Sequence, residues 1–496
     1  MALLAATALA ACSSAPLPDA ATDSLSAGGA EQGTTAAVDL PPAVDDPTTA
    51  QDESAAAPGD PAAAPAVDGS AAAPGGAPAA APGAAPIAGA GPVAPGAPAP
   101  AAPAAAPVRS TLFSGAEDTI GITPTQITLC AHAALTYGAA FNTTADDFNV
   151  YWTALNEAGG VFGRKVVATY ENDNYTPTDA VTAARACKAK NPFLLLGGIG
   201  FDQIPAVRNY VEEQRIPYLH HTATVKGSQG LKYSFTALPT VERVGEGFAQ
   251  LAAQKHRGKK LGIIKRDGAN WEPGVEAFKA AAAKAGITVV AERAVAANKG
   301  NYTDEILAMR NAGAEVVWAW ENALISTQIL VQAKRQGYSP AWLMFPFNLT
   351  SQTLGGDAMT PPLDGVAMFA AYSRGDRGGS FAAYADDLAL FEQQYAKHRP
   401  RADLEGVGGD LLFLNWQAQK ALHDMLVACG PDCTRNRFVD VLTSYRKVPT
   451  SSGCPLDFTR GDRRHGSDQV TFMQTYRAPS GKVNWRNTAQ CVEPGA

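Results

Sequence analysis

The sequence predicts an α/β protein of two lobes, each a parallel sheet flanked by helices, preceded by a long tract that cannot fold. Three observations lead to this prediction. Apolar, β-prone runs alternate with helical patterns from about residue 119, and helical crossovers of this length connect parallel strands. The alternation begins again after "TALPT", residues 236–240. Residues 13–110 contain no aromatic side chain.

Residues 1–12 are a short apolar run that ends in "LAAC", with Cys12 last. The run is far shorter than the roughly 20 residues that a membrane-spanning helix needs. Small residues leading to a cysteine have the form of a bacterial lipobox, in which the thiol is acylated and the chain is cut before it. The alternative is an ordinary secretory signal with an accidental cysteine. No basic residue precedes the run, so we expect the translation start to lie upstream.

The tract at 13–110 consists almost entirely of Ala, Pro, Gly, Ser, Thr, Val and acidic residues. Such a composition cannot bury enough apolar area to offset the entropy lost on ordering. Recurrent proline stiffens the chain, and scattered acids keep it solvated. We expect a disordered tether that lets the folded part move above the membrane that holds Cys12.

The charge balance excludes nucleic acid as a partner of the folded part. The chain has 40 Lys and Arg against 47 Asp and Glu, and ten of these acids but no basic residue lie before Arg109. The remainder is therefore close to neutral. Nucleophile-elbow, zinc-protease and phosphate-loop motifs are absent, so we expect no enzyme, cofactor or metal site. His220 and His221 are adjacent strand residues whose side chains point to opposite faces, which argues against a metal pair.

The first alternating unit has four expected strands and three expected helices. Aromatic and leucine side chains recur at helical spacing over 148–155, and Gly159-Gly160 end that helix. Thr176 and Pro177 occupy capping and first-turn positions. The strands are expected at 126–132, 165–173, 192–200 and 216–221, and the helices at 148–158, 176–190 and 204–215.

The second unit repeats this pattern. Its apolar runs are short and end in charged or glycine-containing loops, as buried parallel strands do. The helices are expected at 241–255, 273–286, 303–313 and 323–337, and the strands at 260–267, 287–295, 314–321 and 341–345.

Export changes the interpretation of the six cysteines after Cys12. In an oxidising compartment an even number indicates disulfides, although six cysteines permit 15 pairings. Buried free thiols are the alternative. Sequence proximity favours the pairs Cys429 with Cys433 and Cys454 with Cys491, which leaves Cys130 with Cys187.

One stretch carries a family resemblance, "LNEAGGVFGRKVVATYENDNYTPTDAVTAARACKAKNPFLLLGGIG". It resembles the type I periplasmic binding proteins of the branched-chain amino acid (Leu/Ile/Val-binding) ABC transporter family. In that family the first helix ends in Asn-x-x-Gly-Gly, Gly-Arg-Lys opens the second strand, and an acidic strand end precedes a helix begun by proline. The matching residues here are Asn156, Gly159, Gly160, Gly163, Arg164, Lys165, Asp173 and Pro177.

The resemblance implies a two-lobed fold whose chain crosses between lobes three times. We place the crossings near 237–239, 370–373 and 448–451. The first lobe would comprise 111–238 and 374–447, including the helical segment 408–430, and the second 239–373 and 448–496. The segment 454–477 is expected as a terminal hairpin on the second lobe, with Gly461-Asp462 helping its turn.

The resemblance also places a ligand in the cleft between the lobes, beyond the carboxyl ends of the strands. No catalytic residue and no metal ligand is expected. Carried over position by position, the family's ligand contacts fall on Tyr137, Gly200, Phe201, Thr222, Ala223, Thr224, Trp271, Trp320, Glu321 and Asn348.

Departures from the family pattern alter the expected ligand. The segment Gly200-Phe201 stands where the family presents serine hydroxyls to an amino acid carboxylate. Phe201, Trp271 and Trp320 would favour a flat or apolar ligand, while Glu321 could accept a cationic group. An aromatic acid or another small organic compound is therefore expected as readily as an α-amino acid.

The expected function is that of a lipid-anchored binding protein, outside the cytoplasmic membrane, that delivers a small organic solute to the permease of an ABC importer. The expected solute is of amino acid, aromatic acid or amide type, and the protein is expected to be monomeric. A ligand sensor that signals to a membrane receptor is the alternative, and the long tether argues against it. An enzyme with no recognisable motif is a third possibility.

Overall fold

The computed structural model describes residues 119–136, 144–198, 200–297, 299–346, 363–368, 385–402, 404, 407–447, 454, 456–461, 464–477 and 483–495. Residues 1–98 and 99–496 form separate units, and all described residues belong to the second unit. Cys12, the tether, Tyr137, Asn348 and the crossings expected at 370–373 and 448–451 lie outside the described residues.

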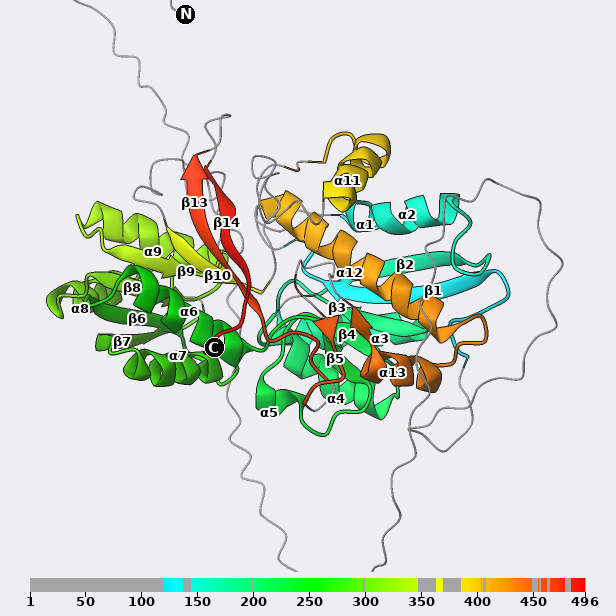
Figure 1. Ribbon diagram of the computed structural model, residues 1–496, viewed down its shortest axis with the longest axis horizontal. Helices are drawn as coiled ribbons and strands as arrows, with labels where there is room; N and C mark the ends of the chain where they lie inside the picture. The colour runs from blue at the N-terminus through cyan, green and yellow to red at the C-terminus, as the bar shows by residue number, and fades with distance from the viewer. Residues whose placement is uncertain are drawn as a thin grey trace, which may run out of the picture. The chain divides into compact units, whose positions relative to one another are not determined.

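The first lobe is built on a five-stranded sheet whose neighbouring strands are all parallel (Figure 1). The strand order is β2-β1-β3-β4-β5, so the chain winds outward in both directions from β1. The strands are β1 (Gln126–Ala133), β2 (Lys165–Asn172), β3 (Leu194–Gly197), β4 (Tyr218–His220) and β5 (Ser234–Thr236).

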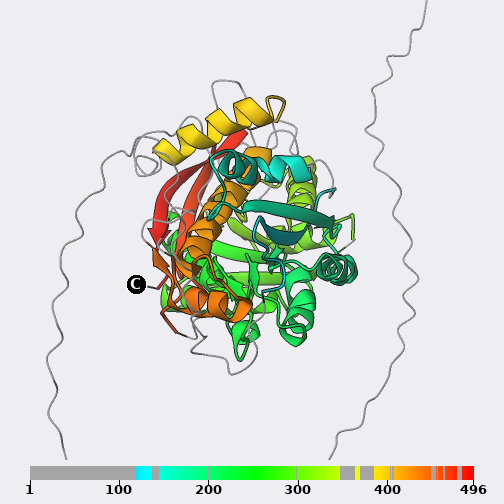
Figure 2. The ribbon, with the colours of Figure 1, turned by 90° about the vertical axis from the view of Figure 1, so that its right-hand side faces the viewer.

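Helices cover both faces of this sheet. Alternate strand residues point to opposite faces, so Cys130 and Leu195 pack with α3 and α4, whereas Leu129 and Leu194 pack with α2, α12 and α13. Figure 2 shows α12, drawn in orange, lying across the face of the sheet that carries Leu129 and Leu194. The helices of this lobe are α1 (Ala145–Phe148), α2 (Val150–Glu157), α3 (Pro177–Ala189), α4 (Gln203–Glu213), α5 (Val225–Ser228), α11 (Ala385–His398), α12 (Val407–Cys429) and α13 (Arg435–Ser444).

The second lobe is built on a seven-stranded sheet of order β14-β13-β10-β9-β8-β6-β7. Strands β6 to β10 pair in parallel, and β13 and β14 add an antiparallel hairpin at the edge. The parallel part of this sheet is as the sequence predicted, and the hairpin makes the whole sheet mixed. The strands are β6 (Lys260–Arg266), β7 (Thr288–Val295), β8 (Val316–Trp320), β9 (Ala341–Met344), β10 (Asp364–Ala367), β13 (Val470–Arg477) and β14 (Val483–Val492).

Two pairs of helices cover the second sheet. On one face Trp318 packs with Phe248 and Phe278; on the other, Val317 packs with Ile306 and residues of α9. Trp318 is fully buried. The helices are α6 (Val241–Lys255), α7 (Glu272–Lys284), α8 (Thr303–Asn311) and α9 (Ala323–Arg335).

The capping signals in the sequence act as expected. The Thr176 side chain accepts a hydrogen bond from the amide of Asp179, and Pro177 begins α3. Gly159 and Gly160 follow α2 with φ angles of 106° and 72°, a region that glycine adopts without strain. A side chain at Gly160 would collide with the carbonyl oxygen of Arg164.

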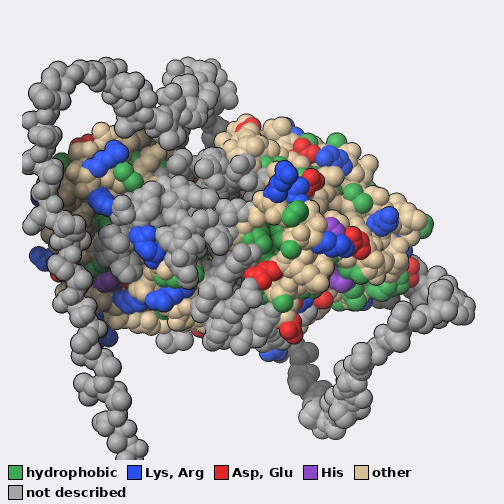
Figure 3. All heavy atoms as spheres, turned by 90° about the horizontal axis from the view of Figure 1, so that it is seen from above, with side chains coloured by type: hydrophobic (Ala, Val, Ile, Leu, Met, Phe, Trp, Pro, Cys, Tyr) green, Lys and Arg blue, Asp and Glu red, His purple; other side chains and the backbone are tan. Residues whose placement is uncertain are grey.

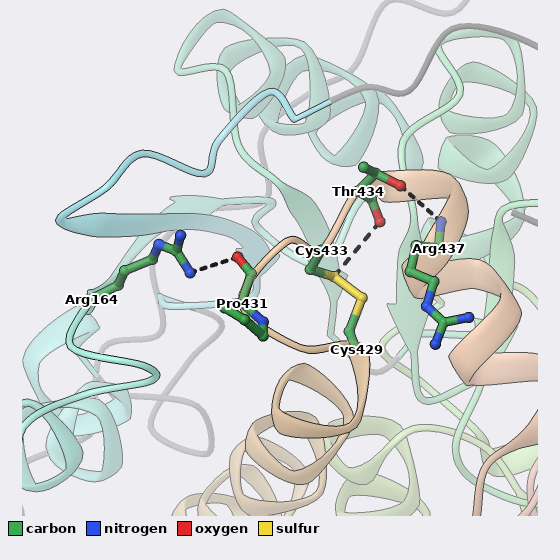
Figure 4. The surroundings of a disulfide bond; sticks show 6 residues. All are labelled: Arg164, Cys429, Pro431, Cys433, Thr434 and Arg437. Atoms are coloured by element: carbon green, nitrogen blue, oxygen red, sulfur yellow. Dashed lines mark hydrogen bonds between the residues drawn. A yellow bond between two sulfur atoms is a disulfide. The ribbon is translucent and has the colours of Figure 1, made fainter. Parts of the chain in front are cut away.

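All three expected disulfide pairs are confirmed: Cys130–Cys187, Cys429–Cys433 and Cys454–Cys491. Figure 4 shows Cys429–Cys433 closing the turn between α12 and α13. The neighbouring Thr434 caps α13 by accepting from the amide of Arg437 at 3.1 Å. Arg164 donates to the carbonyl oxygen of Pro431 in this turn at 2.8 Å, so it also holds α12 and α13 to the edge of the sheet.

The terminal hairpin was wrongly located. The pairing β13 with β14 joins residues 470–477 to 483–492, and the pair β11 (Arg446–Lys447) and β12 (Leu456–Asp457) is separate. Leu456 and Phe458 are buried in the core of the first lobe, because their side chains complete its apolar face beside Phe235. The stretch before β13 therefore packs on the first lobe, and Gly461 is not in the hairpin turn.

The first expected crossing coincides with the change of lobe in the structure. The chain leaves the first sheet at the end of β5 and enters α6, which packs on the second sheet, within residues 237–240. Among the described residues, no helix combines the length and apolarity that crossing a membrane requires.

Candidate functional site

The loop after β3 brings the two lobes into contact. The Asp202 carboxylate, at the start of α4, accepts hydrogen bonds from Asn270 Nδ2 at 3.0 Å and from Trp271 Nε1 at 3.1 Å. Asn270 and Trp271 follow β6 of the second lobe. Both loops lie beyond the carboxyl ends of their strands, which is where ligands bind in open α/β sheets.

Aromatic side chains fill this contact. The Phe201 ring lies 4.4 Å from the Trp271 ring and 5.3 Å from the Trp320 ring, centroid to centroid. The Trp320 indole is fully buried and donates to the carbonyl oxygen of Trp271 at 3.0 Å. The three aromatics expected to line a ligand wall are thus brought together, but here they contact one another and join the core of the second lobe.

The threonines after β4 are held by backbone groups. Thr222 Oγ1 accepts from the amide of Gly200 at 3.3 Å. Thr224 Oγ1 accepts from the amide of Gly227 at 2.9 Å and caps the short helix α5. The carbonyl oxygen of Ala223 accepts from the amide of Val241 at 2.9 Å. These groups therefore fix the loop beside the first crossing.

Glu321, at the end of β8, is only 2 % exposed. Its Oε2 accepts from Arg266 Nε at 2.9 Å, and Arg266 also lies over the Trp271 ring, 5.5 Å from the centroid. Burial raises the pKa of Glu321 to about 7, and the attraction of Arg266 offsets only part of that rise. The cationic group expected for Glu321 is thus supplied by the chain itself.

A buried polar chain crosses the centre of the first sheet. His132 Nδ1 lies 2.9 Å from an Asp173 carboxylate oxygen, and His132 Nε2 lies 2.6 Å from the Tyr218 hydroxyl. All three side chains are almost completely buried. Gly197 makes room for this chain, since a Cβ there would lie 2.4 Å from the Tyr218 hydroxyl. This network was not predicted from the sequence.

His220 and His221 diverge, as expected for neighbours in a strand. His220 Nε2 pairs with the Ser234 hydroxyl at 3.0 Å, and burial lowers the pKa of His220 well below its usual value. His221 faces a cavity on the other side of the sheet. Among the described residues, no three or more His, Cys, Asp or Glu side chains gather where they could hold a metal ion.

That cavity, of about 90 Å³, lies between the carboxyl end of the first sheet and α12. Its walls are mainly apolar and come from the ends of β1, β3 and β4, from Tyr170 and Phe148, and from the first half of α12. The cavity was not predicted from the sequence. The signal that could have indicated it is the pairs of small residues Ala133-Ala134 and Gly197-Gly198, which leave space at the ends of two strands.

The face seen in Figure 3 carries both basic and acidic side chains on its described surface. No continuous basic patch of the kind that binds nucleic acid is visible among the described atoms of that face. This agrees with the nearly neutral charge of the sequence after residue 108.

Comparison with known proteins places these features in context. A family model described as "Periplasmic binding protein" matches residues 136–480. Leu/Ile/Val-binding protein homolog 3 of Brucella melitensis is 28% identical over 181 residues, 35% of this chain and 49% of the relative. Homolog 8 of Brucella abortus is 28% identical over 225 residues, 43% of this chain and 53% of the relative. The chain thus spans about half the length of these curated relatives.

Solved structures show the same fold at low sequence identity. A fatty acid ABC transporter substrate-binding protein from Thermomonospora curvata aligns with a TM-score of 0.64 and 17% identity, covering 76% of this chain and 95% of that one. A solute binding protein of an ABC transporter from Rhodopseudomonas palustris BisB5, in complex with 3,4-dihydroxybenzoic acid, aligns with a TM-score of 0.61 and 14% identity, covering 75% and 99%.

Proposed function

The chain belongs to the periplasmic binding protein family, and on that premise we propose that it is the substrate-binding protein of an ABC importer. In this proposal it captures a small organic solute between its lobes and presents it to membrane permease subunits, without making or breaking a bond. Family membership implies a location outside the cytoplasm. The lobe limits expected from the sequence belong to the proposal, except that Leu456 and Phe458 lie in the core of the first lobe.

The contact between Asp202 and the Asn270-Trp271 loop is the observation that carries this proposal. It joins the two lobes where both sheets present their loops, and few hydrogen bonds hold it. A solute that binds both loops would favour lobe closure by its extra contacts, as in hinged binding proteins. We propose that Gly200, Phe201, Thr222, Ala223, Thr224, Trp271, Trp320 and Glu321, with Tyr137 and Asn348 from outside the described residues, form this site.

The chemistry of the described residues supports a solute with an apolar or aromatic body. Phe201 and Trp271 pack on each other where the lobes meet, so a solute that enters between the lobes would contact their ring faces, and such contacts are worth about 0.5–1.5 kcal/mol beyond their buried area. Solved structures with this fold include a fatty acid transporter's substrate-binding protein and a solute binding protein in complex with 3,4-dihydroxybenzoic acid, and a third is a complex with leucine. We infer a solute of aromatic acid, amino acid or amide type.

A function in binding rather than catalysis is supported by the pairing of His132 with Asp173 near the strand ends. His132 is 0 % exposed and Asp173 2 %, and both ring nitrogens of His132 are already paired. A general base needs a free atom directed at the proton that it removes, and His132, although it lines the cavity between the first sheet and α12, has neither ring nitrogen free.

A thermal-shift screen tests the proposed function. The full chain is heated with amino acids, aromatic acids, amides and polyols, and one class is expected to raise the melting temperature. A ligand at 100 times its dissociation constant stabilises the folded state by about 2.7 kcal/mol. No stabilisation by any class, together with turnover of one of them, would exclude a binding protein.

We also propose that Cys12 carries a lipid anchor. More than one buried acyl chain is needed for stable attachment, and a lipobox cysteine receives several. Cys12→Ala is expected to move the protein from the membrane fraction to the soluble fraction, measured by fractionation and blotting. Unchanged membrane association would refute the lipobox.

A further inference from the structure

We propose that the cavity beneath α12 is a subsite of the first lobe that takes a neutral apolar group bearing a hydroxyl or a similar hydrogen-bond donor. The inference rests on the proposed function, because it assigns this cavity to the apolar body of the solute. The kind of group that the cavity accepts, however, follows from its lining residues alone.

The walls of the cavity suit an apolar group. No Lys, Arg, Asp or Glu side chain lines it, and its leucine, alanine and aromatic side chains come from the strand ends and α12. Burying an unpaired charge there would be costly. A carboxylate on the solute would therefore remain outside, toward the interlobe contact.

The amide of Gln419 supplies an acceptor. Its Nε2 donates to the carbonyl oxygen of Phe148 and to the Tyr170 hydroxyl, both at 2.9 Å. A carbonyl oxygen can only accept, so this contact fixes which end of the amide faces Phe148. Gln419 is 1 % exposed, and its Oε1 has no hydrogen-bond partner among the described residues. Buried polar atoms are nearly always paired, so we infer that a bound molecule donates a hydrogen bond to Oε1.

His221 is a second polar residue in the wall of the same cavity. Its Nδ1 is buried and has no hydrogen-bond partner among the residues that the structure describes. Burial lowers the pKa of His221 to about 4, so the ring is neutral at neutral pH. A neutral imidazole can pair with a hydroxyl, but it cannot balance an anion.

The size of the cavity limits the ligand to one ring or a short alkyl chain. An engineered apolar cavity of about 150 Å³ holds benzene, and this one measures about 90 Å³. A second cavity of about 20 Å³ shares Leu219, His221, Leu414 and Ala418 with it. Together they extend along α12 toward Leu238 at the first crossing.

The cavity adjoins the interlobe contact. Leu411 and Leu414 line it, and both belong to the core cluster that contains Phe201 and Trp271. A solute held by the loops after β3 and β6 could therefore place its apolar end beneath α12.

Titration calorimetry of the full chain with phenol, 1-butanol and benzene tests the subsite. Phenol or 1-butanol is expected to bind saturably, and which of them binds more tightly distinguishes a ring from an alkyl chain. Benzene is expected to bind several-fold more weakly than phenol, because it leaves Gln419 Oε1 unpaired. Absence of saturable binding by both hydroxyl compounds would overturn the proposal.

Filling the cavity provides the matched comparison. Ala418→Met places a flexible side chain in the cavity and is expected to weaken binding of the preferred probe at least tenfold. Ala428→Met, on the exposed end of the same helix, is expected to leave binding unchanged. Ala134→Leu fills the cavity from the end of β1 and serves if Ala418→Met lowers the melting temperature strongly. Equal binding by a folded cavity-filling variant and the wild type would contradict the subsite.

The same variants separate this inference from the proposed function. If a solute found in the thermal-shift screen binds a folded Ala418→Met variant as tightly as the wild type, the subsite is wrong and the proposed function stands. If phenol or 1-butanol binds but no solute stabilises the chain, the cavity does bind a neutral hydroxyl compound. Its assignment to an imported solute is then wrong.

Discussion

Glu321 shows how residue-level burial sets a measurable property. Its carboxylate is buried against Arg266, and its Oε1 has no partner among the described residues. Removing the carboxylate from water favours its protonated form more than Arg266 favours the charged form. The pKa therefore lies at about 7 in place of the ordinary 4.5.

This shift predicts a pH dependence of stability. Because the folded state holds the proton more tightly than the unfolded state, Glu321 stabilises the fold below about pH 4.5, and that contribution is lost as pH rises to about 7. The difference in unfolding free energy between the wild type and Glu321→Gln should fall over this range, by up to about 1.4 kcal/mol per pH unit. Denaturant unfolding of both proteins at several pH values measures it. A difference that does not vary with pH would contradict the burial argument.

Asp202 is a better residue than Trp271 to substitute in a test of the interlobe contact. Trp271 is 4 % exposed and lies in the second-lobe core, so Trp271→Ala would cost about 3–5 kcal/mol of stability and confuse binding with folding. Asp202→Ala removes two hydrogen bonds, worth about 1–3 kcal/mol together. Faster amide exchange at residues 268–275 is expected, whereas Glu213→Ala, exposed on the same helix, should change nothing there. Unaltered exchange in Asp202→Ala would show that the contact does not hold the lobes.

The residues of the site were only partly predictable. Phe201, Trp271 and Trp320 were identified because ligand contacts of the family that the sequence resembles fall on them, and the structure does bring them together. Their contact with one another could not be read from spacing, since it depends on how the lobes meet. The cavity was missed for a similar reason: Gln419 and Ala418 follow β1 by more than 280 residues, and only the docking of α12 brings them to it.

At the scale of elements, local sequence patterns were sufficient to predict helices and strands where the two alternate regularly. The strands and helices predicted over 126–345 lie within a few residues of their positions in the structure, but α1, α5 and β5 were not predicted. The wrongly placed segment lies after residue 440. Leu456 and Phe458 look like one strand of a hairpin, but they complete the first-lobe core, and β13 pairs instead with β14.

The disulfides give a prediction at this scale. Cys130–Cys187 links β1 to α3 across 57 residues, whereas Cys429–Cys433 spans only four. Loop-closure entropy makes the first worth about 4 kcal/mol and the second about 2 kcal/mol. Paired Cys→Ala variants, compared by denaturant unfolding, should show the larger loss for Cys130–Cys187. The reverse order would mean that local strain or packing outweighs chain entropy.

At the scale of the whole molecule, the fold and the family agree. Two sheets present their loops to one contact, and the family model covers most of the folded part. The ligand is the property that the fold does not fix, because a few side chains at the strand ends decide it. In the site that we propose those side chains include aromatic rings, and the adjoining cavity is mainly apolar.

Titration calorimetry of the full chain at two temperatures, with the solute that stabilises it most, tests the central claim. We expect one solute per chain, a negative heat-capacity change from burial of apolar surface, and recovery of the solute chemically unchanged. Saturable binding with no heat-capacity change, or conversion of the solute into a product, would contradict a protein that encloses a small apolar solute without reacting with it.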